Sequence, residues 1–244
     1  MLAFSSLLGN VEGQNIYRIW YDKPASYWEE ALPVGNGRIA AMVFGNPQLE
    51  QIQLNEETVS AGSPYQNYNE EAKTALPEMR RLIFEGKYEE AQNMAATKIL
   101  SQVGNEMPYQ TVGRLNIRYP DHKKVNNYYR DLDISNAVAV TRYEVDGVEF
   151  TEETFASFTD QLVIRHIKAS KPGAINCELF FNTPMRDPKR SIYGKKGLRL
   201  EGITHGSRYF SGKVHYCADL DVKHKGGKVI TANDTLLSVQ GASE

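Results

Sequence analysis

The sequence predicts a mainly β fold: an antiparallel β-sandwich with a short inserted helical pair. Apolar and polar residues alternate over most of the chain after Tyr109, turn residues separate the alternating stretches, and a helical period occurs in one region only. Strands that follow one another without intervening helices pair antiparallel, and repeated βαβ units are therefore excluded.

The stretch from residue 17 to 62 has short apolar runs separated by Pro, Gly and Asn, which predicts strands and turns. The glycine spacing within residues 35–40 also fits a dinucleotide-binding loop. That loop needs a buried strand before it and a helix after it, whereas here the preceding segment is charged and the following apolar run is only six residues long. We therefore expect a hairpin with Asn36 and Gly37 at positive φ, which places Arg38 at the start of a buried strand.

Residues 69–100 have the period of two short amphipathic helices joined at Gly86. Ala75, Leu82 and similar residues mark the apolar face of the first helix. Pro77 lacks the amide that an interior turn requires, and we expect it in the first turn of its helix or at a bend.

Beyond residue 109 the period is two, and Asp146-Gly147 predicts a hairpin turn followed by a return strand over 148–158. Apolar residues at alternate positions from Ile175 to Phe181 predict one buried strand face. Further strands are expected at 161–167, 198–203, 214–222, 227–230 and 235–240. The basic segment 183–197 is interpreted as a solvated loop.

Length, charge and cysteine content limit the function classes. A chain of 244 residues fits one large domain, the net charge of −2 offers no basic surface for nucleic acid, and no apolar stretch approaches the roughly 20 residues that span a bilayer. Cys177 and Cys217 are interpreted as buried thiols in strands in preference to a disulfide. Residues 1–16 are expected to be a flexible terminus or the remnant of a signal peptide.

No residue pattern points to catalysis by this chain alone. Adjacent glutamates such as Glu56-Glu57 and Glu152-Glu153 point to opposite faces of a strand and cannot form a facing acid and base, so we interpret them as solvated. The histidines form no close pair, no Cys-x-x-Cys is present, and there is no Gly-x-Ser-x-Gly elbow. We expect no catalytic residue, metal or cofactor.

Several motifs in the same order resemble the first domain of glycoside hydrolase family 95, the α-L-fucosidases. They are WEEALPVGNGRIAAMVFG (28–45), IQLNEETVSAG (52–62), EMRRLIFEGKYEEAQNMA (78–95), PYQTVGRLNI (108–117), the long stretch from YYRDLD to LVIRHI (128–167) and the closing GGKVI region (226–230). The similarity runs from about residue 17 to residue 244.

The resemblance implies a three-part enzyme with an amino-terminal β-sandwich of the supersandwich type, a catalytic (α/α)6 barrel and a small carboxy-terminal β domain. Such enzymes hydrolyse α-L-fucosyl linkages with inversion of configuration, using residues of the barrel. The barrel is absent from residues 17–244, so this chain is not expected to be catalytic by itself. The implied partners are the barrel of the same polypeptide and fucosylated or related glycans. The resemblance also implies that the protein is exported, to the periplasm or outside the cell.

Two positions depart from the family pattern: Ser60 replaces an aromatic residue, and Arg114 stands where Asp is common. These departures leave a galactose-type specificity open. Polar residues of the most family-like loops are the candidates for contact with substrate or barrel, namely Asn36, Arg38, Asn55 and Glu56. The alternative is that Asn36 only makes the turn, while Asn55 and Glu56 hydrogen-bond the loop backbone or the barrel. Trp28 is interpreted as packing in the core or between domains. The alternative function is a stand-alone carbohydrate-binding, lectin-like module.

Overall fold

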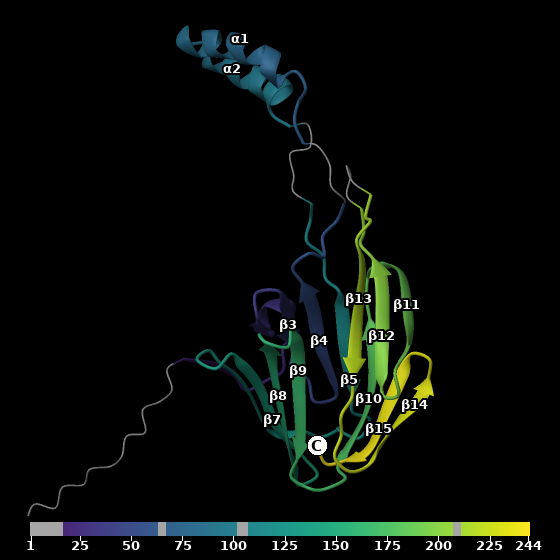
Figure 1. Cartoon of the computed structure of the whole chain (residues 1–244). Coiled ribbons are helices and arrows are strands. Elements are labelled where there is room, and N and C mark those ends of the chain that lie inside the picture. Colours follow the sequence, from purple (N-terminus) through teal and green to yellow (C-terminus); the bar gives the residue numbers. More distant parts are fainter. Residues whose placement is uncertain (1–16, 63–66, 102–106, 207–210) are drawn as a thin grey trace, which may run out of the picture.

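The computed structural model describes residues 17–62, 67–101, 107–206 and 211–244. The expectation for residues 1–16 therefore lies outside the described residues. Within the described part of the chain, fifteen strands form three sheets in which all neighbouring strands are antiparallel. The predicted mainly β, antiparallel fold is confirmed (Figure 1).

The largest sheet has seven strands in the spatial order β14-β15-β10-β5-β4-β3-β2. Its strands are β2 (Leu32–Gly35), β3 (Ile39–Val43), β4 (Leu49–Glu56), β5 (Gly113–Arg118), β10 (Ile175–Asn182), β14 (Lys228–Asn233) and β15 (Leu236–Ala242). The buried strand face predicted for residues 175–181 is found in β10, where Ile175, Cys177, Leu179 and Phe181 are all buried. Alternation thus predicted this face correctly.

Two smaller sheets complete the sandwich. One has the order β1-β6-β7-β8-β9, with β1 (Arg18–Tyr21), β6 (Asn126–Asp133), β7 (Val138–Val145), β8 (Val148–Ser157) and β9 (Leu162–Ala169). The other comprises β11 (Arg186–Tyr193), β12 (Gly197–Ile203) and β13 (His215–Asp221). The first packs over β2 and β3, and the second lies against β10 and β15. Apolar side chains of all three sheets join one core cluster, in which Ile52, Leu200 and Leu237 are completely or almost completely buried.

Two details of the strand prediction are wrong. The segment 183–197 is not a loop, because Arg186–Tyr193 forms β11 and pairs with β12. Pro188 is accommodated because β11 is an edge strand with a register shift between Arg186 and Lys189, where a missing amide costs no ladder bond. Cys217 is exposed on β13, whereas Cys177 is buried as expected, and both thiols are free.

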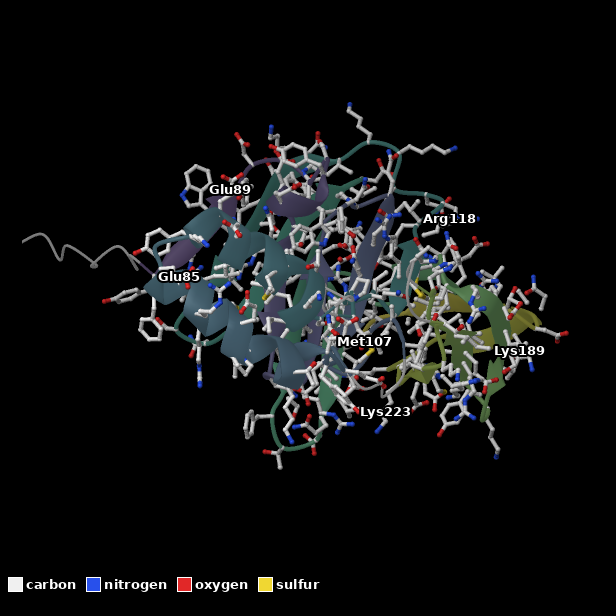
Figure 2. The ribbon with its side chains drawn as sticks, turned by 90° about the horizontal axis from the view of Figure 1, so that it is seen from above. Glu85, Glu89, Met107, Arg118, Lys189 and Lys223 are labelled. Atoms are coloured by element: carbon white, nitrogen blue, oxygen red, sulfur yellow. The ribbon has the colours of Figure 1, made fainter. Side chains whose placement is uncertain are left out.

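The helical pair consists of α1 (Ala72–Phe84) and α2 (Tyr88–Met94), and a π-helical turn (Ala95–Ile99) extends α2. Gly86 joins the helices at a φ of 75°, as its position predicted. Pro77 lies in the second turn, and α1 continues past it. The pair stands clear of the sheets in Figure 1. Viewed from above, Glu85 and Glu89 mark its outer end, while Arg118 lies at the surface of the sheets (Figure 2).

None of the described helices has the length and apolar character needed to cross a membrane.

Candidate functional site

The β2–β3 hairpin carries the first two predicted site residues. Gly35 pairs with Ala40, and Gly37 has a φ of 91°, so the glycine-rich segment is a hairpin tip as expected. Asn36 does not have positive φ, and the predicted backbone of this residue was wrong. Its side-chain oxygen instead accepts hydrogen bonds from the backbone amides of Arg38 (3.1 Å) and Ile39 (3.0 Å), and these bonds stabilise the turn.

Asn36 also joins two separate turns. Its side-chain amide donates to the carbonyl of Ser157 at 2.9 Å and to the side chain of Gln161 at 3.3 Å. These acceptors belong to the connection between β8 and β9, so the tip of the hairpin is tied to the five-stranded sheet. These four hydrogen bonds of the Asn36 side chain all stabilise the scaffold.

Arg38 and Glu56 form an ion pair beside the hairpin. The Arg38 Nε lies 3.3 Å from Oε1 of Glu56, and the amide of Glu57 donates to the Arg38 carbonyl at 2.9 Å. Partial burial opposes ionisation of Glu56, but hydrogen bonds from the hydroxyl and amide of Thr58 and from Arg38 outweigh it and lower its pKa. Glu56 is therefore a carboxylate near neutral pH and is poorly suited to donate a proton.

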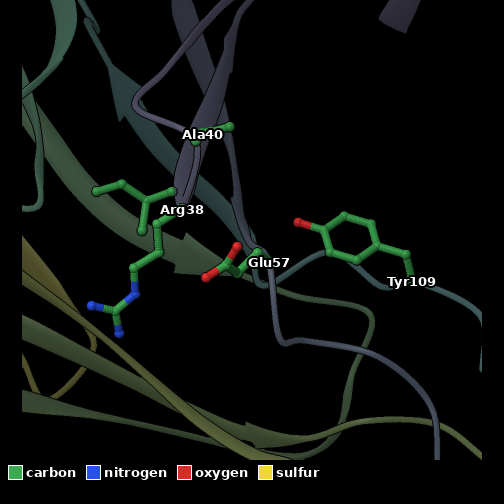
Figure 3. Close-up of a pocket in the computed structure, with 6 residues that line it drawn as sticks. Arg38, Ala40, Glu57 and Tyr109 are labelled. Carbon is green, nitrogen blue, oxygen red and sulfur yellow. The ribbon is translucent and has the colours of Figure 1, made fainter. Parts of the chain in front are cut away.

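An open hollow of about 300 Å³ adjoins this pair and is lined by Gly37, Arg38, Ile39, Ala40, Glu57 and Tyr109. The Tyr109 hydroxyl is directed toward the Glu57 carboxylate, and the Arg38 guanidinium extends away from both (Figure 3). Partial burial and then the charges of Glu56 and Glu57 raise the pKa of Tyr109. The hollow can offer a phenol, a carboxylate and a guanidinium as hydrogen-bonding groups to a polar ligand.

Asn55 is separated from Glu56 by the pleat of β4. Asn55 pairs with Ala40, and the next residue, Glu56, pairs with Ile39. Consecutive residues of a strand point to opposite faces of the sheet. The structure therefore brings Arg38 and Glu56 together and keeps Asn36 nearby in the same hairpin. Asn55 lies in the adjoining register position but faces the other side of the sheet.

A buried ion cluster was missed by the sequence interpretation. Arg165 on β9 donates to Glu50 on β4 at 3.0 Å and to Glu152 on β8. Glu152 was expected to be solvated, but it is 1% exposed and also accepts the hydroxyls of Tyr119 and Tyr143, each at 2.8 Å. The available signal was its alternation with Phe150 and Thr154, which are buried on the same face.

Glu50 has the perturbed acidity that often accompanies catalysis. Burial raises its pKa to about 7, although the charge of Arg165 and the amides of Gly45 and Phe44 act in the opposite direction. Its side chain is nevertheless fully buried between two sheets and does not line the hollow at the β2–β3 hairpin. The cluster joins strands, and substrate cannot reach it in this arrangement.

Trp28 lies in a short 3₁₀ turn (Trp28–Glu30) before β2 and is 48% exposed, so it is not part of the core of this domain, and its packing between domains stays a prediction. No group of three His, Cys, Asp or Glu side chains in the described ranges has the geometry to hold a metal ion. The site thus contains hydrogen-bonding groups on turns, and the paired carboxyls that hydrolyse a glycosidic bond are not assembled among its residues.

Comparison with known proteins matches residues 19–244 to the model of the glycosyl hydrolase family 65 N-terminal domain. The chain is 37% identical over 181 residues to "Alpha-L-fucosidase 2" of Arabidopsis thaliana. This alignment covers 72% of the chain and 21% of that protein. It is also 26% identical over 162 residues to "Probable alpha-fucosidase A" of Aspergillus niger, covering 62% of this chain and 20% of the relative. The chain spans about a fifth of the length of these curated relatives.

Proposed function

The chain belongs to the glycosyl hydrolase family 65 N-terminal domain family, and from this premise we propose that residues 17–244 form the non-catalytic β-sandwich domain of an α-L-fucosidase-like glycoside hydrolase. The similarity to the Arabidopsis thaliana α-L-fucosidase carries this proposal. The parent enzyme is proposed to belong to family 95, to hydrolyse α-L-fucosyl linkages with inversion of configuration, and to be exported from the cell. Fucosylated or related glycans are its proposed substrates.

The domain is proposed to support the catalytic (α/α)6 barrel of the same polypeptide. The helical pair favours this role, because among the described residues the main contacts of α1, α2 and the π-helical turn are with one another and the pair stands clear of the sheets. Two helices of 13 and 7 residues are too short to be stable without further packing. The pair also exposes large apolar side chains: Phe84 is 87% exposed and Tyr88 is 69% exposed.

The predicted site residues fit the same proposal. The end of β4 that carries Glu56 leads into the connection to the helical pair, so the hollow and the helices belong to the same end of the sandwich. Arg38, Glu57 and Tyr109 there leave hydrogen-bonding groups exposed. We propose that Asn36, Arg38, Asn55 and Glu56 help this end of the domain to pack on the barrel beside the substrate entrance.

A chimaera tests the proposal. The aligned segment of the Arabidopsis thaliana relative is replaced by this chain, and release of fucose from 2′-fucosyllactose is measured. We expect the chimaera to release fucose and this chain alone to release none. Release by the chain alone at the rate of the chimaera would contradict a non-catalytic role.

The contribution of the helical pair is tested in the same chimaera. We expect the double substitution Phe84→Ser and Tyr88→Ser to lower activity or yield of folded enzyme, because two exposed apolar contacts are lost. Lys73→Ser, at an exposed position of α1, is the matched control and should have little effect. Equal behaviour of the two variants would contradict docking through the helical pair.

A further inference from the structure

The tip of the β2–β3 hairpin contains the dipeptide Asn36-Gly37, and no other Asn-Gly occurs in the sequence. In such a dipeptide the glycine nitrogen can attack the asparagine Cγ, because no side chain on the glycine blocks the approach. A bond between this nitrogen and Cγ forms, the Cγ–Nδ2 bond breaks, and Nδ2 leaves as ammonia with the proton of the glycine nitrogen. Water then opens the resulting succinimide ring to aspartate or isoaspartate. The whole conversion consumes only water.

The nucleophile of this reaction is unhindered in the structure. Gly37 is exposed and has a φ of 91°, and none of the described atoms lies within 4 Å of the position that a Cβ would take on it. Within the described ranges, no group accepts a hydrogen bond from the Gly37 amide. The glycine nitrogen is therefore free to react, and control of the reaction falls to the asparagine side chain.

The Asn36 side chain is held at both of its polar atoms. Its oxygen accepts hydrogen bonds from the amides of Arg38 and Ile39, which fixes the plane of the side-chain amide. Its nitrogen, the leaving group, donates to the carbonyl of Ser157 at 2.9 Å and to Oε1 of Gln161 at 3.3 Å. Attack on Cγ requires the side chain to rotate, and rotation breaks the bonds to the β8–β9 connection. That connection therefore protects Asn36.

We propose that Asn36 is a site of spontaneous deamidation and that the β8–β9 connection controls its rate by holding Nδ2. The reaction proceeds only in molecules in which the hairpin tip has detached from Ser157 and Gln161. It is a covalent record of this local opening, because the loss of ammonia is not reversed. This modification site goes beyond the supporting role proposed above and does not depend on it.

The product separates two functions that Asn36 combines. An aspartate at this position still accepts the amides of Arg38 and Ile39, so the turn is kept. It has no donor for the Ser157 carbonyl, and a carboxylate oxygen beside that carbonyl is repelled. The hairpin tip is thus released from the five-stranded sheet. Isoaspartate also adds a backbone carbon before Gly37, which shifts the hairpin at the hollow.

The conversion is measured by incubating the chain in mildly alkaline buffer and analysing tryptic peptides by mass spectrometry. Residues 19–38 form one tryptic peptide, because Pro24 follows Lys23, and Asn36 is its only asparagine or glutamine. We expect conversion to be several-fold slower in the native chain than in the chain unfolded in urea. Gln161→Ala should raise the native rate by about threefold to tenfold, as expected for an opening that breaks one hydrogen bond fewer. Gln92→Ala, at an exposed position of α2, is the matched control and should convert at the rate of the parent.

Hydrogen exchange distinguishes local from global opening. In Gln161→Ala the amides of β10 should exchange as in the parent, whereas those of residues 158–161 should exchange faster. Asn36→Asp, which represents the product, should show the same faster exchange at 158–161. The proposal is overturned if native and unfolded chains convert equally, if Gln161→Ala converts like Gln92→Ala, or if its faster conversion accompanies faster exchange throughout β10. Unchanged exchange at 158–161 in Asn36→Asp would also overturn it, because the connection would not depend on Nδ2.

Discussion

Nη2 of Arg165 on β9 lies 3.0 Å from Oε2 of Glu50 on β4, and this buried ion pair joins the five-stranded sheet to the seven-stranded sheet. The same guanidinium faces Glu152, so one cation serves two buried carboxyl groups. Burial of charges is costly, and removal of one member leaves its partners uncompensated. The cluster therefore makes the relative position of the two sheets sensitive to single substitutions.

Replacement of Arg165 by Met should destabilise the chain strongly. The substitution leaves Glu50 and Glu152 buried without their cation, and we expect the free energy of unfolding to fall by about 3–5 kcal/mol. Urea denaturation followed by circular dichroism measures the change. Arg199→Met is the control, since it breaks an exposed ion pair with Asp219 and should cost much less. Similar losses in both variants would contradict the structural role of the cluster.

The buried Glu50 should make stability depend on pH. Burial raises its folded pKa from 4.5 to about 7, so between these values the folded state binds more protons than the unfolded state. The stabilising contribution is complete below pH 4.5 and is lost as pH rises through 7, by an amount on the order of 3 kcal/mol. The Glu50→Gln variant should lack this slope, so the stability of the parent relative to the variant should fall as pH rises from 4.5 to 7. A difference that grows in the opposite direction would show that Glu50 is ionised throughout.

Gly45 and Gly37 should respond differently to alanine. Both have positive φ, at 73° and 91°, but a Cβ at Gly45 would lie 2.7 Å from the Tyr128 hydroxyl, whereas none of the described atoms lies within 4 Å of one at Gly37. We expect Gly37→Ala to cost about 1 kcal/mol from backbone strain alone and Gly45→Ala to cost clearly more. Denaturant midpoints of the two variants compare the costs. A larger loss at Gly37 would contradict the packing described for Gly45.

The two cysteines should differ in reactivity. Cys177 is buried in β10, where desolvation raises its thiol pKa to about 12, while Cys217 is exposed on β13. A maleimide should label Cys217 in the native chain and Cys177 only after unfolding, as read by peptide mass spectrometry. Cys217→Ser should abolish native labelling. Labelling of Cys177 at the same rate would show that β10 opens readily.

Much of the fold followed from local patterns. Alternation from Ile175 to Phe181 predicted the buried face of β10, and Asp146-Gly147 predicted the turn between β7 and β8. The segment 186–193 was missed because its basic, Pro-containing pattern resembles a loop, and pairing with β12 makes it a strand. Local propensity does not include the hydrogen bonds that a neighbouring strand supplies.

The candidate site was only partly predictable. The residues of the β2–β3 hairpin were identified from its turn chemistry, but the bond from Asn36 to Ser157 connects residues 121 positions apart. The contribution of Tyr109 to the hollow depends equally on a distant segment meeting the hairpin. Spacing within a motif carries no information about such meetings, and residues outside the motif could not be assigned to the site.

The sequence by itself determined the antiparallel β class, the helical pair with Gly86 at its turn, and the motifs of a fucosidase-like hydrolase. Only the tertiary structure decided that Glu50, Glu152 and Arg165 form one buried cluster and that the exposed Trp20 ring stacks on Tyr129. The physical reason is that alternation defines two faces of each strand, whereas the choice of which face is covered depends on how the sheets stack. A charged residue on a covered face then has to find its partner across the core.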